Sequence, residues 1–245
     1  MSCVLLCVFV LFFISFSAFV GQRKNIPTDI TSYRPISLLP VISKILERLI
    51  LHRINAEVQN HDWFPEHLFG FRKAHTTIQQ CHRLANNINQ ALEAREYCTA
   101  VFLDISQAFD KVWHPGLLLK IKRTLPPSYH NIIKSYLLHR RMMVAYNTAL
   151  STPIQMTSGV PQGSVLGPFL YALFTADVPQ HDSTVLSTFA DDTAILSWHA
   201  HINEAISNLQ THLLSIEEWS RQWRLKINES KSKHVTFTLR KGNIP

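Results

Sequence analysis

The stretch Thr188–Thr193, with the letters TFADDT, constrains the fold more than any other part of this sequence. Apolar residues that favour β-structure flank it, at 185–187 and at 194–198. Two such runs joined by a few polar residues predict a β-hairpin whose tip carries Asp191 and Asp192. An isolated Asp-Asp pair at a turn usually marks a solvated corner, because Asp is common in tight turns. The pair therefore needs a second observation before it indicates a function.

That second observation is a carboxylate far upstream, near the end of an expected strand. The run 99–105 is almost wholly apolar, and Asp104 is its one charged residue. A charge in such a place is costly unless a cation or a partner compensates for it. Carboxylate oxygens are the ligands that Mg²⁺ prefers. Two such ions can activate an attacking hydroxyl and stabilise a leaving pyrophosphate, so the three carboxylates indicate phosphoryl transfer.

The charge balance suits a protein that binds polyanions. The sequence has 24 Lys and Arg against 17 Asp and Glu, a net charge of +7 and a pI of about 9.4. A basic surface around an acidic centre is typical of nucleic-acid binding, although charge alone also allows a basic protein without that role. The four cysteines, Cys3, Cys7, Cys81 and Cys98, form no CxxC pair. They support neither a disulfide framework nor a zinc site.

Residues 1–22 differ in composition from the rest of the chain, because they carry no charge and are rich in Val, Leu and Phe. Their length permits a membrane span, but the positive region of a secretory signal is missing. Arg23 and Lys24 follow the segment, so the positive-inside rule would leave the remainder in the cytosol. We expect the segment to be extraneous to the domain, with membrane anchoring as the alternative if it is genuine. The domain itself is expected in the nucleus or the cytoplasm.

The rest of the chain predicts an α+β fold with an antiparallel sheet, because helical periodicity alternates with short β-favouring runs. Helices are expected around 42–54, 78–92, 115–121, 128–137, 169–174 and 202–216, and strands around 99–105, 142–146, 185–187, 194–198, 223–228 and 235–239.

Apolar side chains at steps of three and four define the expected inner faces of the first two helices. Thr76 or Thr77 is the expected N-cap of the second helix. The two faces are Ile42, Ile45, Leu46, Leu49 and Ile54, and Ile78, Cys81, Ile88 and Leu92.

Six motifs, in order along the chain, resemble those of reverse transcriptases. Three look like the central polymerase motifs, two are similar to fingers motifs of the non-LTR retrotransposon branch, jockey-like elements in particular, and one resembles the next palm motif. In chain order they are YRPISLL at 33–39, FGFRKAHTT at 69–77, AVFLDISQAFDKV at 100–112, SGVPQGSVLGP at 158–168, FADD at 189–192 and KINESKSK at 226–233.

The resemblance implies a right-hand polymerase fold made of fingers and a ferredoxin-like palm. It places the fingers at 23–98 and the palm at 99–245, with a fingers insertion around 115–155, and it implies truncation before the thumb. The implied activity is that of an RNA-directed DNA polymerase from a transposable element. This enzyme joins deoxynucleoside triphosphates to a DNA primer on an RNA template with Mg²⁺, or alternatively Mn²⁺. A catalytically silent remnant, or an RNA-binding protein that retains the fold, is the alternative.

Matched to the motifs, the three aspartates Asp104, Asp191 and Asp192 correspond to the catalytic, metal-binding carboxylates. The resemblance also assigns a metal contact to the main-chain carbonyl of Ile105. Lys231 falls at the position suggested to protonate pyrophosphate, with an ordinary surface lysine as the alternative.

Further matches concern the nucleotide. Phe109 falls where an aromatic ring packs under the incoming sugar and excludes a 2′-hydroxyl, with an ordinary core residue as the alternative. Asp110 matches a frequent family acid and is expected to be structural rather than a metal ligand. Gln162 and Gly163 match the loop that lies along the incoming nucleotide. Arg34 and Arg72 match fingers positions near the triphosphate and template. For each of them, the alternative is an ordinary solvated basic residue at the surface.

Overall fold

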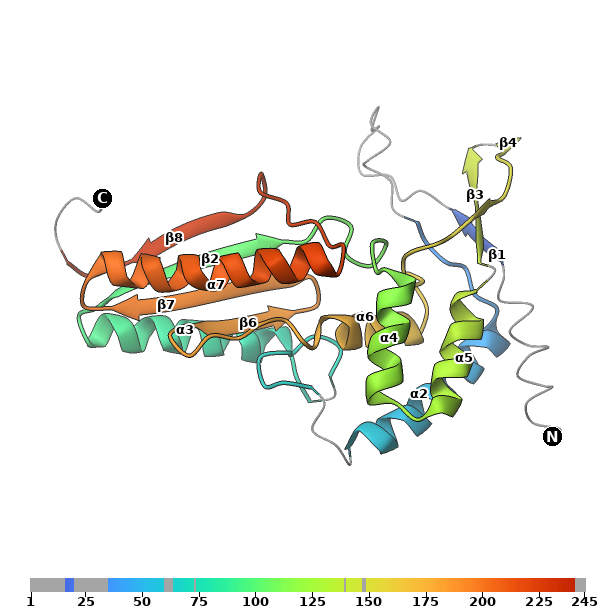
Figure 1. Ribbon diagram of the computed structural model, residues 1–245, viewed down its shortest axis with the longest axis horizontal. Helices are drawn as coiled ribbons and strands as arrows, with labels where there is room; N and C mark the ends of the chain where they lie inside the picture. The colour runs from blue at the N-terminus through green and yellow to red at the C-terminus, as the bar shows by residue number, and fades with distance from the viewer. Residues whose placement is uncertain are drawn as a thin grey trace. The chain divides into compact units, whose positions relative to one another are not determined.

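The computed structural model describes residues 16–19, 35–59, 64–72, 74–138, 140–146 and 149–240. Arg34 and most of the apolar segment 1–22 lie outside these ranges, so their predicted roles stay predictions. The chain divides into two units, each built from two stretches of sequence (Figure 1). Unit 1 takes residues 1–63 and 109–174, and unit 2 takes residues 64–108 and 175–245. The predicted division into fingers at 23–98 and palm at 99–245 has boundaries that differ from those of the two units, and it stays a prediction.

Unit 2 is built on an antiparallel sheet with the strand order β6-β7-β2-β8. The predicted hairpin is confirmed as β6 and β7, and the strand that ends in a carboxylate is confirmed as β2. The predicted strand at 223–228 is wrong, because the segment consists of a turn at 223–224 followed by irregular chain, in which Ile227 makes one isolated bridge to Ile105. The strands are β2 (Tyr97–Asp104), β6 (Val185–Phe189), β7 (Asp192–His199) and β8 (Lys233–Phe237).

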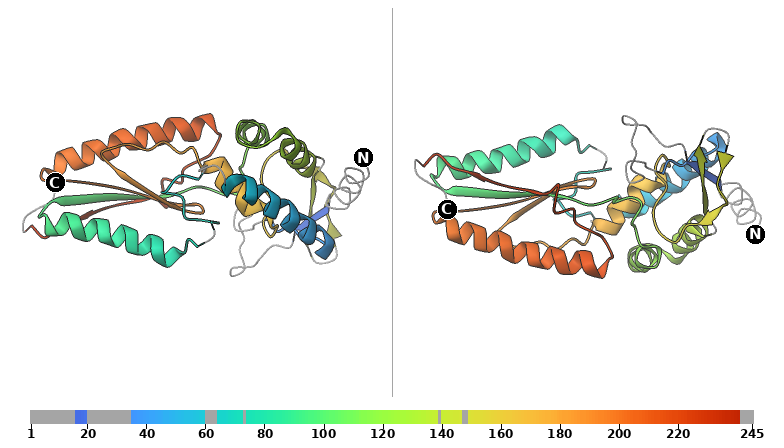
Figure 2. Two further views of the ribbon diagram at one scale, coloured as in Figure 1. Left: turned by 90° about the horizontal axis from the view of Figure 1, so that it is seen from below. Right: turned by 90° about the horizontal axis from the view of Figure 1, so that it is seen from above.

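Two helices, α3 (Thr77–Glu93) and α7 (Ile202–Gln222), cover opposite faces of this sheet (Figure 2). Side chains alternate between the faces of a strand, so alternate β2 residues face each helix. Cys98 and Ala100 pack with Leu84 of α3 on one face. On the other face α7 contributes the buried side chains Ala205, Leu209 and Ile216.

The start of α3 follows from its sequence. The Thr76 side chain accepts a hydrogen bond from the Gln79 N–H, and the Gln79 side chain accepts one from the Thr76 N–H. This capping box satisfies two backbone donors at the helix start, and it confirms the predicted N-cap. The predicted inner face is partly wrong, because Ile78 is 70% exposed and Cys81 is also exposed. Gln80, which is buried, takes the inward position instead.

Unit 1 contains most of the remaining helices and a group of short strands. Strand β1 lies parallel to β3, whereas β4 and β5 pair with β3 in the antiparallel sense. Among the described residues, no helix combines the length and apolar character that a membrane crossing requires. The elements are α2 (Val41–Gln59), α4 (His114–Thr124), α5 (Pro127–Leu137), α6 (Leu166–Thr175), β1 (Phe16–Phe19), β3 (Arg141–Tyr146), β4 (Ala149–Leu150) and β5 (Ile154–Gln155).

The inner face of α2 differs from the predicted one. Ile42, Ile45 and Leu49 were expected inside but are 63%, 50% and 58% exposed. Ile54 is buried as predicted, and the other buried side chains of this helix within 41–57 are Ser43, Glu47 and Ile50. Two of these are polar, so a periodicity count of apolar residues alone misjudges which side of the helix faces inward.

Glu47 is buried because it caps the first turn of the apolar helix α6. One of its oxygens, Oε2, accepts hydrogen bonds from the N–H groups of Val165 and Leu166, at 2.6 and 3.1 Å. The other oxygen, Oε1, accepts one from the Tyr136 hydroxyl at 3.1 Å. At the far end of α6 the buried Lys120 ammonium donates to the Phe174 carbonyl. A negative charge at the first turn and a positive charge at the last complement the helix dipole.

Candidate active site

The three predicted carboxylates lie at one end of the unit 2 sheet. Asp104 is directly opposite Asp192 in the antiparallel pair of β2 and β7. Side chains in such a pair point to the same face, with Cβ atoms about 4.5–5.5 Å apart. Asp191 belongs to the two-residue turn between the paired residues Phe189 and Asp192. The hairpin register therefore places the two acidic motifs next to each other.

The electrostatics of this cluster favour a cation. The pKa of Asp192 is raised above its usual value, first by burial and then by repulsion from Asp191 and Asp104. A second observation is that the Lys231 Nζ lies 3.8 Å from Asp104 Oδ2. Both groups are partly exposed, so this ion pair contributes little to stability. The predicted Lys231 is thus beside the carboxylates in the structure.

The segment after α7 supports the Asp104 end of β2. The Asp104 carbonyl accepts a hydrogen bond from Asn228 N–H at 2.7 Å, and the Asp104 N–H donates to Ser232 Oγ at 3.4 Å. Ile105, whose carbonyl was predicted as a metal contact, forms its bridge with Ile227 in the same segment. Sequence reasoning identified this segment as a motif but missed its role as a support for the site.

The hairpin turn contains a strained residue. Ala190 has φ = 57°, in the left-handed region that residues other than glycine rarely adopt. It is the first of the two turn residues, a position that is usually occupied by glycine when its φ is positive. Such a conformation costs about 1–3 kcal/mol and persists only where the surroundings enforce it. The neighbouring segment, residues 67–70, enforces this conformation.

Residues 67–70 run alongside β6 and reach the Ala190–Asp191 turn. The Phe69 N–H donates to the Thr188 carbonyl at 3.0 Å, and the Thr188 N–H donates to the His67 carbonyl at 2.9 Å. A Cβ built on Gly70 would lie 2.1 Å from the Ala190 nitrogen, so only glycine fits there. Sequence reasoning missed this role of Gly70, for which the available signal was a glycine between two aromatic residues in FGFRK.

Gln80 connects helix α3 to the same support. Its Nε2 donates to the carbonyls of His67 and Thr188, each at 3.2 Å. Burial lowers the pKa of His67 to about 4, so the imidazole beside this connection is neutral near pH 7. The buried polar face of α3 therefore holds together the two chain segments under the carboxylate turn.

Arg72 was predicted to lie near the triphosphate and template. In the structure its Nη1 donates to the carbonyls of Pro65 and Leu68, at 3.0 and 3.1 Å. These bonds hold the loop that carries Gly70 in shape. A contact of Arg72 with substrate stays a prediction.

The first testable prediction concerns Gly70. We expect Gly70→Ala to displace the Ala190–Asp191 turn, because the added methyl would collide with the Ala190 backbone. A displacement of about 1 Å can reduce a reaction rate about 10²-fold. The measurement is single-nucleotide incorporation onto an oligo(dT) primer on poly(rA), with thermal unfolding to verify the fold. Ile78→Ala, at an exposed position in the same unit, is the control. Incorporation equal to that of the control would contradict the proposed support.

Unit 1 contains a second group of predicted residues, around the loop 158–164. Gly159 has φ = 88°, and a Cβ there would lie 2.9 Å from the Asp110 carbonyl oxygen. Gly163 has φ = 93° and packs against the Ser37 carbonyl, while the Ser37 N–H donates to the Gln162 carbonyl at 2.8 Å. The two glycines allow this loop to lie close to its neighbours.

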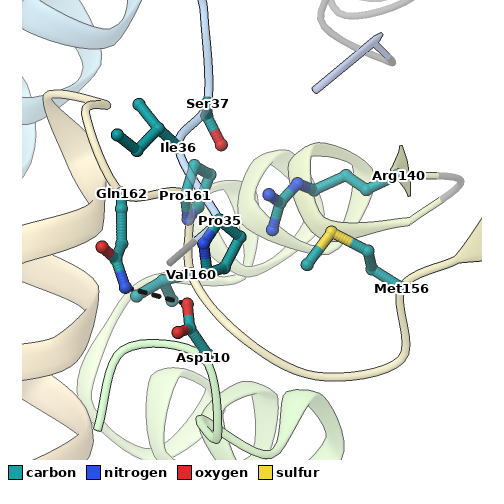
Figure 3. A pocket seen from close by; sticks show the side chains of 9 residues that line it. All are labelled: Pro35, Ile36, Ser37, Asp110, Arg140, Met156, Val160, Pro161 and Gln162. Atoms are coloured by element: carbon teal, nitrogen blue, oxygen red, sulfur yellow. Dashed lines mark hydrogen bonds between the residues drawn. The ribbon is translucent and has the colours of Figure 1, made fainter. Parts of the chain in front are cut away.

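The predicted nucleotide residues Phe109 and Gln162 belong to this group. The Phe109 ring is half-buried and stacks on the buried Tyr171 ring, with centroids 4.6 Å apart. The Gln162 Nε2 donates to Asp110 Oδ1 at 2.9 Å (Figure 3). Asp110, Gln162 and the buried Arg140 line one pocket of unit 1. Sequence reasoning did not single out Arg140, which follows a helix without any motif.

The predicted residues thus form two groups, one within each unit. Unit 2 holds the three aspartates, Ile105, Arg72 and Lys231, and unit 1 holds Phe109, Gln162 and Gly163. Within the described ranges, no three His, Cys, Asp or Glu side chains converge tightly enough to form a ready-made metal centre. The donor chemistry nevertheless fits Mg²⁺, because Asp191 and Asp104 help to raise the pKa of Asp192, and a hard cation relieves that repulsion between carboxylates.

Comparisons with known proteins identify the family of this chain. Residues 23–241 match the family model described as reverse transcriptase (RNA-dependent DNA polymerase). The chain is 48% identical over 219 residues to the probable RNA-directed DNA polymerase from transposon X-element of Drosophila melanogaster, covering 87% of this chain and 24% of that protein. It is 44% identical over 234 residues to the RNA-directed DNA polymerase from mobile element jockey of the same species, covering 92% and 26%. The chain thus spans about a quarter of the length of these relatives.

A solved structure shares the fold. Apo telomerase from Candida tropicalis, truncated from its C-terminal domain, aligns with a TM-score of 0.61 at 11% identity, covering 94% of this chain and 52% of that one. The family match covers most of the sequence, including the residues whose carboxylates β2 and the β6–β7 hairpin bring together. The chain therefore belongs to the reverse transcriptase family, and the relatives that it resembles include those of jockey-like non-LTR retrotransposons.

Proposed function

We propose that this chain acts as the RNA-directed DNA polymerase domain of a jockey-like retrotransposon, adding deoxynucleotides to a primer 3′-hydroxyl on an RNA template. The observation that carries the proposal is the pairing of Asp104 with Asp192, with Asp191 in the adjoining turn. The strand order β6-β7-β2-β8 supports a ferredoxin-like palm within a right-hand polymerase fold.

In this proposal the three aspartates and the Ile105 carbonyl hold Mg²⁺, with Mn²⁺ as a second choice. Reverse transcriptases generally use a divalent metal, which when bound supplies activation of the primer hydroxyl and neutralises phosphate charge. Lys231 is placed beside Asp104 at 3.8 Å, where an ammonium can donate a proton to the leaving pyrophosphate. Template, primer and deoxynucleoside triphosphates are the partners that follow from this chemistry.

The residues of unit 1 serve the nucleotide in the same proposal. Phe109 forms the floor under the incoming sugar, and the loop of Gln162 and Gly163 lies along the nucleotide. Arg34 and Arg72 bind near the triphosphate and template. The stacking of Phe109 on Tyr171 supports the first assignment, because a fixed ring can exclude a 2′-hydroxyl by its position.

The second prediction tests whether Phe109 lies under the sugar of the incoming nucleotide. We expect Phe109→Val to admit ribonucleotides, because the smaller side chain leaves room for a 2′-hydroxyl. Losing part of a stacked ring also destabilises the protein, and full truncation of a buried Phe costs about 3–5 kcal/mol. The ratio of ribo- to deoxynucleotide incorporation is measured in folded variants, with Phe109→Tyr as the control that keeps a ring. Unchanged discrimination in Phe109→Val would return Phe109 to an ordinary packing role.

The third prediction tests the polymerase function directly. With poly(rA) and oligo(dT) we expect incorporation of dTTP that depends on Mg²⁺. We also expect the unfolding temperature to rise with Mg²⁺ concentration, because a ligand that binds only the folded state stabilises it. Template–primer binding without incorporation would favour the alternative of a silent remnant or an RNA-binding protein. Loss of both binding and incorporation would overturn the proposal.

A further inference from the structure

Asp110 and Gln162 form a polar pair whose chemistry fixes the orientation of the glutamine amide. The Gln162 Nε2 donates to Asp110 Oδ1 at 2.9 Å, as the dashed line in Figure 3 shows. An ionised carboxylate can only accept hydrogen bonds, so the amide must present its NH₂ group to Asp110. The amide oxygen of Gln162 is consequently turned away from the carboxylate and is presented as an acceptor.

The surroundings of Asp110 hold it in place. The Asp110 carbonyl accepts a hydrogen bond from the Ser158 hydroxyl at 3.3 Å, and Gly159 packs against the Asp110 backbone. Arg140 is 3% exposed and donates to the Gly159 carbonyl at 3.1 Å. Burial lowers the pKa of Arg140, and Tyr136, Asp110 and Glu47 oppose that effect, so the buried guanidinium lies within electrostatic reach of the Asp110 carboxylate. The carboxylate is therefore in place before any ligand arrives.

We propose that Asp110 is a positioning residue for Gln162, which it orients so that the amide oxygen meets a hydrogen-bond donor of the incoming nucleotide. The inference rests on the proposed function, because it takes the Gln162 loop as part of the nucleotide site. It assigns to Asp110 neither a metal contact nor a packing role. Asp110 determines whether Gln162 presents its amide oxygen or its NH₂ group to the nucleotide.

Substitution can separate orientation from packing. In Asp110→Asn the side chain keeps its size, but its own NH₂ can donate to the Gln162 oxygen, so the amide is free to reverse. In the double variant Asp110→Asn with Gln162→Glu, the Asn NH₂ donates to a carboxylate, and an acceptor is presented again. A role in packing alone predicts that Asp110→Asn is silent, whereas an orienting role predicts that it is harmful and that the double variant recovers.

The experiment has two arms on the full chain. In the first, the side-chain amide resonance of Gln162 is followed by ¹⁵N NMR, and it is expected to shift in Asp110→Asn but not in Ser158→Ala, which removes only the bond to the residue 110 carbonyl. In the second, dTTP is titrated into each protein with poly(rA)–oligo(dT) and Ca²⁺, a divalent ion chosen to follow binding without turnover. Loss of the hydrogen bond between the Gln162 amide oxygen and the nucleotide predicts an apparent Kd up to about tenfold weaker for Asp110→Asn, with at least half of the loss, on a logarithmic scale, restored in the double variant.

The outcomes are separable. Wild-type affinity in Asp110→Asn, or no recovery in the double variant, overturns the orienting role while nucleotide binding by the wild-type chain stands. Absence of dTTP binding by the wild-type chain overturns the proposed function and this inference with it. An unchanged Gln162 resonance in Asp110→Asn overturns the pair itself, whatever the chain binds.

Discussion

Replacing Asp104 or Asp191 by Asn is expected to reduce nucleotide incorporation by about 10³-fold or more while the fold is kept. Losing a carboxylate ligand of a catalytic metal removes several kcal/mol of transition-state stabilisation, and each 1.4 kcal/mol is a factor of ten. Asn keeps the size of Asp but lacks its charge. The geometry of the β2–β7 pair, in which Asp104 faces Asp192, is thus expected to survive the substitution.

Stability measurements give an independent reading of the same variants. The pKa of Asp192 is raised in the folded state. The protonated carboxyl therefore contributes stability that is complete below the unfolded-state pKa, and this stability is lost as the pH rises through the folded-state pKa. At pH 7 the ionised cluster therefore destabilises the metal-free fold. Asp191→Asn is expected to raise the unfolding temperature without metal and to weaken the Mg²⁺-dependent rise.

The control for both measurements is Asp182→Asn, which changes an exposed aspartate of the same unit away from the cluster. It is expected to behave like the wild type in incorporation and in the response to Mg²⁺. Near-normal incorporation by Asp104→Asn or Asp191→Asn would remove the basis of the proposed active site.

Replacing Glu47 by Ala is expected to lower the free energy of unfolding by about 3 kcal/mol. The side chain is 1% exposed and accepts three hydrogen bonds, from Tyr136, Val165 and Leu166. Its loss leaves buried donors without an acceptor, each of which costs about 1–3 kcal/mol. For a protein of this size the change corresponds to a fall in unfolding temperature of roughly 6–12 °C.

Glu47→Gln is expected to cost less, because the amide oxygen still accepts while its NH₂ group faces another donor. Glu57→Ala, at an exposed position on the same helix, serves as the control and is expected to change stability by less than about 0.5 kcal/mol. Urea denaturation followed by far-ultraviolet circular dichroism measures all three variants. Equal stability of Glu47→Ala and Glu57→Ala would show that the buried cap contributes nothing.

The parts of the fold that were predictable from sequence are those specified by local patterns. The β6–β7 hairpin follows from two apolar runs around a short polar turn, and the capping box of α3 follows from Thr76 and Gln79. The three aspartates were found because each one sits at the end of a strand or in its turn. These signals depend on neighbours in sequence, so no tertiary information was needed.

What was missed depends on contacts between distant residues. Glu47 and Gln80 turn their helices toward polar partners, so the apolar periodicity of α2 and α3 selects residues that are exposed, such as Ile42 and Ile78. Gly70 is required by the backbone of Ala190, which lies far along the chain. The hydrogen bond between Asp110 and Gln162 likewise joins two motifs whose proximity neither one encodes alone.

The central position of β2 in the unit 2 sheet has a consequence for biosynthesis. Strand β2 pairs with β7 and β8, which leave the ribosome long after it, and all of 109–174 is made in between. Pairings between such distant segments require costly loop closure and form slowly. A nascent chain that has passed β2 thus exposes an apolar strand with two unpaired edges until both partners have been translated. Translation pauses before residue 237 would prolong the period during which this strand can aggregate.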